Sequence, residues 1–204
     1  NLFIKIGRVQ YVFVTLAIIG FIIFGQAFIN LWAGLNYYES YKVAVLLMVP
    51  MLVALIQNIG IEIRKAQNKH KTPAIFMMFI ALLNIIITIP LAKMYGAVGS
   101  AIGTSIAVII NQIFINVYYQ KAIGLDMRLF WKEVINISRG IIIPLFVGAC
   151  LMFFRNNISD LKFLFLAIPY SIIYMISIYV IGLNDFEKKL FINDRLKQML
   201  KRKK

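Results

Sequence analysis

Long apolar runs dominate the sequence and restrict it to one class of fold. Six of them reach or approach the roughly 20 residues that a helix needs to cross a hydrocarbon layer of about 30 Å. They occupy residues 9–31, 42–61, 73–92, 97–119, 134–154 and 163–181. In lipid, a single span satisfies its backbone N–H and C=O groups by forming a helix. The pattern predicts an all-α, polytopic membrane helix bundle of about six transmembrane helices.

The last 21 residues differ from the rest, so the chain divides into a transmembrane lobe at 1–183 and a tail at 184–204. Asn184 and Glu187 have the spacing of a capping box. Apolar residues then recur at helical spacing, and the chain ends in Lys201, Arg202, Lys203 and Lys204. This combination predicts a basic amphipathic helix on the cytoplasmic surface, held there by anionic membrane lipids.

The cations are distributed unevenly between the two predicted sides of the membrane. With six spans, 18 of the 22 Lys and Arg fall on one side, in the two termini and in two cationic loops expected at 62–71 and 120–139. The other four are Lys42, Lys93, Arg155 and Lys162. Such a bias marks the cytoplasmic side. It predicts a multi-pass protein with both ends cytoplasmic, and it explains the net charge of +14 without a nucleic-acid partner.

A run of small residues follows the third apolar segment. Gly96 is suited to a tight turn because it has no Cβ to clash at positive φ. Gly99 and Gly103 then lie four residues apart, which places them on one helix face where small residues allow close approach of a second helix. We therefore expect an external turn at Gly96 followed by a densely packed helix. The segment lacks the Gly-Lys-Ser/Thr ending of a phosphate-binding loop.

The chain carries no pattern typical of enzymes or metal sites. There is no Ser/His/Asp set and no cluster with metal-ligand spacing. We interpret the single histidine, His70, as a solvated loop residue and the single cysteine, Cys150, as part of the apolar packing. No span contains a paired carboxylate of the kind expected for a proton relay. We expect neither an enzymatic activity nor a metal or other cofactor.

Amide side chains stand out within the spans. Asn58, Glu62 and Lys65 fall on one helical face, at the cytoplasmic end of a span that contains Pro50. This face is the best candidate for a polar substrate cavity, and the further cavity candidates are Gln57, Asn84 and Asn111. Hydrogen bonding between helices explains single amides equally well, so both interpretations stay open.

Several segments together resemble a known family of transporters. The sequence is similar to the C-terminal portion of the Wzx-type polysaccharide and O-antigen flippases. These form the oligosaccharide flippase branch of the multidrug/oligosaccharidyl-lipid/polysaccharide exporter superfamily. The resemblance rests on Phe24-Gly25, Leu31-Trp32-Ala33-Gly34, Tyr37-Tyr38, Pro50, residues 57–63 and 66–70, Asn84, Pro90, and the turn at 96–101. The turn is shared across the superfamily, whereas residues 57–70 favour the polysaccharide branch.

The resemblance implies a protein of two helical lobes in the bacterial cytoplasmic membrane, of which this chain would be the second. The chain starts at Asn1 rather than Met, which fits a fragment without its N-terminal lobe. The implied activity is transfer of undecaprenyl-pyrophosphate-linked oligosaccharide from the inner to the outer leaflet by alternating access, with a polysaccharide polymerase as a possible partner. A cation-coupled multidrug and toxin exporter and a non-transporting membrane scaffold are the alternatives.

Overall fold

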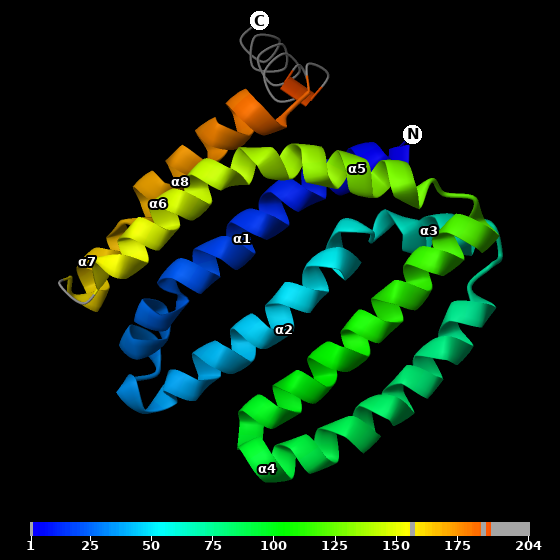
Figure 1. Ribbon diagram of the computed structural model, residues 1–204, viewed down its shortest axis with the longest axis horizontal. Helices are drawn as coiled ribbons and strands as arrows, with labels where there is room; N and C mark the ends of the chain where they lie inside the picture. Colours follow the sequence, from blue (N-terminus) through cyan, green and yellow to red (C-terminus); the bar gives the residue numbers. More distant parts are fainter. Residues whose placement is uncertain (1, 156–157, 185–186, 189–204) are drawn as a thin grey trace, which may run out of the picture.

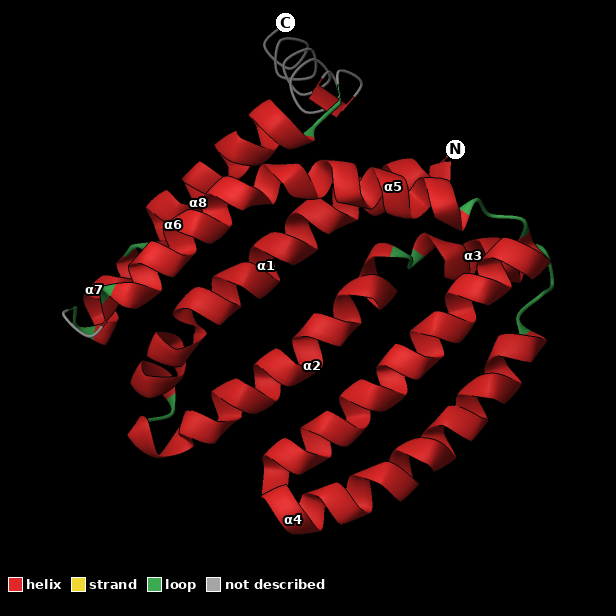
Figure 2. Ribbon diagram, viewed as in Figure 1, coloured by secondary structure: helices red, strands yellow, loops and turns green. Residues whose placement is uncertain are grey.

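The computed structural model describes residues 2–155, 158–184 and 187–188, and this part is helical throughout except for short connections (Figure 2). Five helical segments are long and apolar enough to cross a membrane: 2–32, 35–56, 71–123, 127–153 and 160–182. The third segment folds back on itself at Gly96, so the described residues form six rods (Figure 1). The predicted all-α bundle is confirmed.

The rods divide into eight α-helices joined by short turns. The helices are α1 (Leu2–Trp32), α2 (Tyr38–Ile56), α3 (Ile59–Ala66), α4 (Lys71–Tyr118), α5 (Met127–Ser138), α6 (Ile142–Phe153), α7 (Asp160–Phe165) and α8 (Ala167–Ser177). The connections include 3₁₀ turns at Leu35–Tyr37 and Arg139–Ile141 and π-helical turns at Tyr119–Ile123 and Ile178–Gly182.

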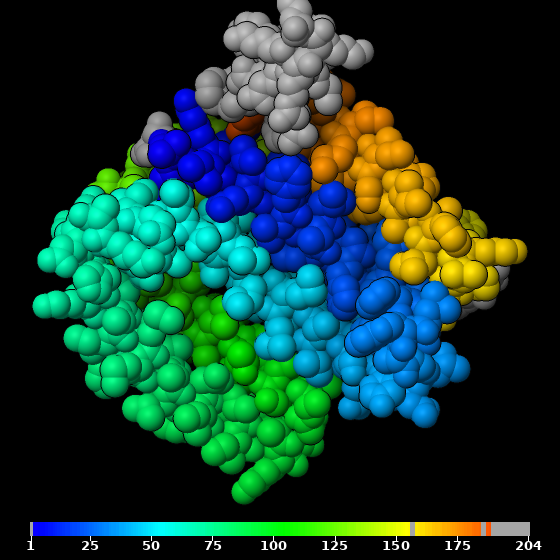
Figure 3. Space-filling model, turned by 180° about the vertical axis from the view of Figure 1, so that it is seen from behind, coloured from blue at the N-terminus to red at the C-terminus, as the bar shows by residue number. Residues whose placement is uncertain are grey.

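Helix α1 is the centre of the bundle. It packs against α2 on one side and against α5, α6, α7 and α8 on the other, while α4 packs against α2 (Figure 1). The space-filling view shows α1 between α2 and the α7–α8 segment (Figure 3). One apolar core at the end that holds the N-terminus includes Phe3, Tyr119 and Phe130, and a second core at the other end includes Phe24 and Phe163.

The connections collect at two opposite ends of the bundle. At the first, which we call the basic end, Lys69 Nζ donates to the carbonyl of Ala122 at 2.6 Å and Arg8 Nη2 donates to the carbonyl of Gly182 at 3.1 Å. The N-terminus, the α3–α4 and α4–α5 connections and the end of α8 therefore lie together. At the opposite end, Asn30 Nδ2 donates to Asp160 Oδ2 at 3.0 Å.

The turn predicted at Gly96 is present and forms the bend of an α4 hairpin. Gly96 has φ 60° and ψ −137°, a conformation that L side chains rarely adopt. Beyond the bend, a Cβ added at Gly99 would collide with the carbonyl oxygen of Leu91, and one at Gly103 would collide with Thr88. The small residues therefore let the two arms of the hairpin pack backbone to backbone.

Several helix boundaries differ from the predicted ones. The first helix starts at Leu2 rather than residue 9, the second ends at Ile56 rather than residue 61, and residues 127–138 of the expected cationic loop at 120–139 form α5. In α5, Phe130, Val134 and Ile137 are buried at i, i+4 and i+7. One apolar face is enough to fold an otherwise charged segment as a helix against the core.

The predicted capping box after α8 is formed in part. The carboxylate of Glu187 accepts the backbone N–H of Asn184 at 2.9 Å, as a capping box requires. The predicted tail helix otherwise lies outside the described residues.

Candidate functional site: a groove beside α5

A buried amide cluster joins α2 to the second arm of α4. Gln57 ends α2, and its side chain is only 2% exposed. Its Nε2 donates to Asn116 Oδ1 at 3.1 Å, and its Oε1 accepts from Gln112 Nε2 at 3.3 Å. Because these buried groups pair with one another, they avoid the cost of leaving polar atoms unsatisfied away from water.

The cluster continues to α5 through a tryptophan. The indole Nε1 of Trp131 donates to Asn116 Oδ1 at 2.8 Å, so this oxygen accepts from both α2 and α5. Asn116 Nδ2 in turn donates to the carbonyl of Gln112 at 2.7 Å. Three helices thus meet at a single amide.

A large hollow lies at the basic end, between α5 and the end of α4. Its volume is about 810 Å³, within the range of small-molecule sites. Among its lining residues are four cations, namely Lys121, Arg128, Lys132 and Arg139. The remaining lining residues are Asn116, Val117, Gln120, Met127, Trp131, Ile135 and Asn136. We call this space the cationic hollow.

A second hollow of about 390 Å³ lies next to the cationic hollow, between α2 and the second arm of α4. It is lined by Pro50, Val53, Ile109, Gln112 and Ile113, together with Asn116, Val117 and Trp131. The last three residues also line the cationic hollow. The two hollows therefore adjoin one another, and we call them together the groove; one part is lined by cations and the other by amides and aliphatic side chains.

Local sequence explains why α5 presents its charges to the groove. Asp126 caps the helix, since its Oδ1 accepts the N–H of Leu129 at 2.9 Å. Gln120 Oε1 accepts the N–H of Met127 at 2.8 Å. With Phe130 and Val134 buried against the core, the 3.6-residue period turns Arg128 and Lys132 to the opposite side.

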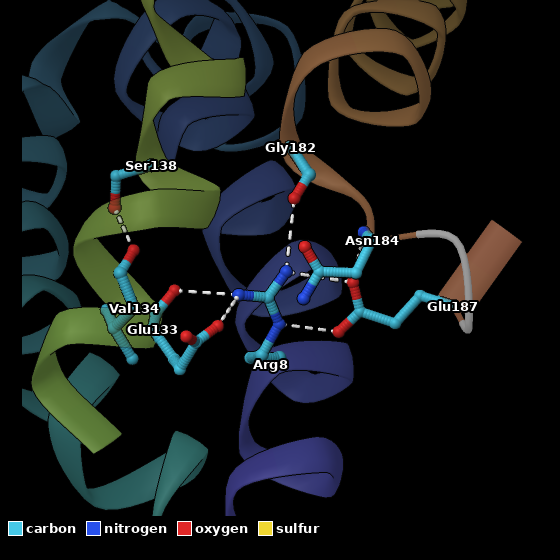
Figure 4. Close-up of polar contacts among 7 residues, drawn as sticks. All are labelled: Arg8, Glu133, Val134, Ser138, Gly182, Asn184 and Glu187. Carbon is cyan, nitrogen blue, oxygen red and sulfur yellow. Dashed lines mark hydrogen bonds and ion pairs between the residues drawn. The ribbon is translucent and has the colours of Figure 1, made fainter. Parts of the chain in front are cut away.

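On its other side, α5 is tied to α1 by a buried arginine. Arg8 is 3% exposed, and all five of its N–H donors are used (Figure 4). Two go to the Glu133 carboxylate and carbonyl, two to the Glu187 carboxylate and one to the carbonyl of Gly182. Arg8 thereby holds α1, α5 and the segment after α8 in a fixed arrangement.

The structure brings together only part of the predicted site. Gln57 belongs to the amide cluster, and Pro50 lines the groove. Glu62 and Lys65 instead form an ion pair at 2.9 Å with both side chains more than half exposed. Asn58 is also exposed, and neither it nor this ion pair lines the groove.

The other two cavity candidates lie away from the groove. Asn84 Oδ1 accepts from Thr88 Oγ1 at 2.8 Å within the first arm of α4, which satisfies the amide locally. Asn111 Oδ1 is buried without a hydrogen-bond partner among the described residues, and Asn111 lines neither hollow.

Sequence reasoning does not find the charged residues that the structure places at the site. From the sequence, residues 1–8, which include Arg8, are expected to be the end of a cytoplasmic loop, and Lys121, Arg128, Lys132 and Arg139 are expected in the cationic loop at 120–139. The signal that could have found α5 is the spacing of Phe130, Val134 and Ile137, which is helical. Trp131, which precedes Lys132 on α5, belongs to no sequence pattern that would mark it as a site residue.

Comparison with known proteins finds no match among protein-family models, curated proteins or solved structures. Functional inference therefore depends on the groove itself.

Proposed function

We propose that this chain is one lobe of a flippase that moves a polyprenyl-diphosphate-linked oligosaccharide across a bacterial cytoplasmic membrane. The observation that carries the proposal is the pair of adjoining hollows, one lined by four cations and the other by Gln112, Asn116 and aliphatic side chains. A second lobe, supplied by the N-terminal part of a longer protein, completes the pathway.

The chemistry of the groove suits an amphipathic substrate. A diphosphate-linked sugar loses its hydrogen bonds to water when it enters hydrocarbon, at a cost of several kcal/mol for each unpaired polar group. Cations and amides replace those bonds along the groove. The aliphatic part, with Val53, Ile109 and Ile113, is compatible with the polyprenyl chain.

The arrangement of charge supports an orientation with the basic end in the cytoplasm. Lys69 is in the α3–α4 connection, Lys121 is in the α4–α5 connection and Arg128 is on α5, yet all three lie at the same end of the bundle. Both chain ends are then cytoplasmic, as the positive-inside bias predicts. The substrate would enter the groove from the leaflet in which a cytoplasmic membrane enzyme had assembled it.

The test is made on the whole protein that carries this chain, in its host. Depletion should cause lipid-linked oligosaccharide to accumulate on the cytoplasmic face while surface polysaccharide is lost. Accumulation is measured by labelling lipid extracts from inverted and right-side-out vesicles. Complementation with the intact gene should reverse both effects.

Two results would contradict the proposal. Unchanged lipid-linked oligosaccharide with new sensitivity to cationic drugs would indicate a multidrug exporter. Full complementation by a variant that inserts but lacks the groove cations and amides would indicate a scaffold. Neither result is expected, since among the described residues the groove has no acidic residue to bind a cationic drug.

A further inference from the structure

The four cations of the cationic hollow have no carboxylate partners among the described residues. Lys121, Arg128, Lys132 and Arg139 are exposed, and none forms an ion pair with a described residue. Arg8, Lys65 and Arg155 all have such partners. These four positive charges are therefore not neutralised by direct ion pairs among the described residues, which favours an anionic ligand.

The acidic residue nearest in sequence to these cations is directed elsewhere. Glu133 directly follows Lys132, yet its carboxylate binds Arg8 on α1, at 2.5 Å (Figure 4). Successive residues of a helix are about 100° apart, so α5 can separate its acid from its bases. By binding Glu133, Arg8 keeps this carboxylate away from the cationic hollow.

Apolar side chains lie between the cations. Val117, Trp131 and Ile135 line the same hollow, and Trp131 is held in place by its hydrogen bond to Asn116. A free inorganic anion makes no use of these surfaces. A phosphate group attached to an apolar chain uses both kinds of surface, since burial of its CH₂ groups stabilises binding.

We propose that the cationic hollow binds the diphosphate of a polyprenyl lipid, with the first isoprene units against Val117, Trp131 and Ile135. This assignment rests on the proposed function, and it places the headgroup of the lipid-linked substrate at α5 rather than at α3. Anionic phospholipids also carry a phosphate group, so they are the competing ligands for this site. The number of cations favours the diphosphate, because it carries more negative charge than the single phosphodiester of phosphatidylglycerol.

The chain provides its own reporter for this binding. Its tryptophans are Trp32 and Trp131, and Trp32 is 80% exposed at the opposite end. With W32F, and with any tryptophan of the proposed second lobe replaced by Phe, emission comes from Trp131 alone. The protein in phosphatidylcholine nanodiscs is titrated with geranylgeranyl diphosphate, with geranylgeraniol and with phosphatidylglycerol. We expect a saturable change in emission with the diphosphate at concentrations where the other two cause little change.

Charge variants test which cations take part. R128Q/K132Q is expected to weaken diphosphate binding about tenfold or more. The control K71Q/K93Q removes the same charge from exposed positions on the first arm of α4 that do not line the hollow, and should change the affinity less than twofold. K121Q/R139Q removes the other two groove cations and is expected to weaken binding similarly, should the first variant fold poorly.

Each contrary result overturns the assignment. An equal response to geranylgeraniol would show that the apolar chain alone binds, and an equal response to phosphatidylglycerol would show a general anionic-lipid site. Equal affinities of R128Q/K132Q, K121Q/R139Q and K71Q/K93Q would place the diphosphate elsewhere. Transport by the whole protein separates the two proposals. If the whole protein binds the diphosphate but does not transport lipid-linked oligosaccharide, the proposed flippase function is contradicted. If R128Q/K132Q transports it at the normal rate, the proposed diphosphate site is contradicted.

Discussion

Arg8 on α1 and Glu133 on α5 form an ion pair 2.5 Å long in which the arginine is 3% exposed and the glutamate 24% exposed. The same guanidinium binds Glu187 through two N–H groups. Removing one partner from such a cluster costs about 3–5 kcal/mol, because the remaining charges stay buried without compensation. Replacing the whole cluster with neutral groups costs less.

We therefore predict that R8M strongly lowers the thermal stability of the protein in detergent, with a loss of about 3–5 kcal/mol. The triple variant R8M/E133Q/E187Q should recover part of that loss, since it removes the uncompensated carboxylates. The matched control K71M removes one exposed cation and should change stability by less than about 0.5 kcal/mol. Equal stabilities of R8M and K71M would contradict the importance of the cluster.

The helical rods and the turn at Gly96 could be predicted because both depend on local sequence. A run of apolar residues must form a helix in lipid, and a glycine at positive φ needs only its neighbours. Arg8 could not be predicted in the same way. Its partners Glu133 and Glu187 are 125 and 179 residues away, and their approach depends on how α1, α5 and α8 pack.

The groove could not be predicted from the sequence, for a related reason. Its walls come from α2, α4 and α5, so no single stretch of sequence contains its pattern. Gln57 was identified because buried amides are conspicuous in an apolar span. The sequence favours the face at Asn58 over the cations of α5, because the charges at 120–139 are typical of a cytoplasmic loop.

The α4 hairpin gives the second prediction. G99A should destabilise the protein by about 1–3 kcal/mol, because its Cβ would push against the backbone of Leu91 in the other arm. The control G20A has no neighbour within 4 Å of the added Cβ, so it should be neutral or slightly stabilising. Thermal unfolding in detergent distinguishes the two, and similar melting temperatures would show that the arms do not pack closely.

The buried amide cluster gives the third prediction. Q57L leaves the Asn116 and Gln112 side chains without their partner on α2, at a cost of about 1–3 kcal/mol. The neighbouring N58A alters an exposed amide and should cost less than about 0.5 kcal/mol. In a double-mutant cycle, Q57L and Q112L should be non-additive, since the first substitution already breaks the shared bond. Additive losses would contradict the cluster.

The orientation of the protein in the membrane gives the fourth prediction. With Cys150 and any cysteine of the proposed second lobe replaced by Ser, single cysteines at Asn36 and His70 report on opposite ends of the bundle, and both positions are exposed. A membrane-impermeant maleimide added to intact spheroplasts should label N36C/C150S at once. It should label H70C/C150S only after permeabilisation, because the basic end faces the cytoplasm. The reverse pattern would invert the proposed topology.

A direct comparison of the two candidate sites gives the fifth prediction. Glu62 and Lys65 form an exposed ion pair, of a kind that contributes about 0–1 kcal/mol, and they lie outside the groove. E62Q/K65Q should therefore transport lipid-linked oligosaccharide at a rate within about twofold of the wild type, whereas R128Q/K132Q should lose about tenfold or more. Both rates are measured with the whole protein in proteoliposomes at equal amounts of inserted protein. If E62Q/K65Q stops transport and R128Q/K132Q does not, the headgroup is bound at α3, and the cations of α5 serve only to orient the chain in the membrane.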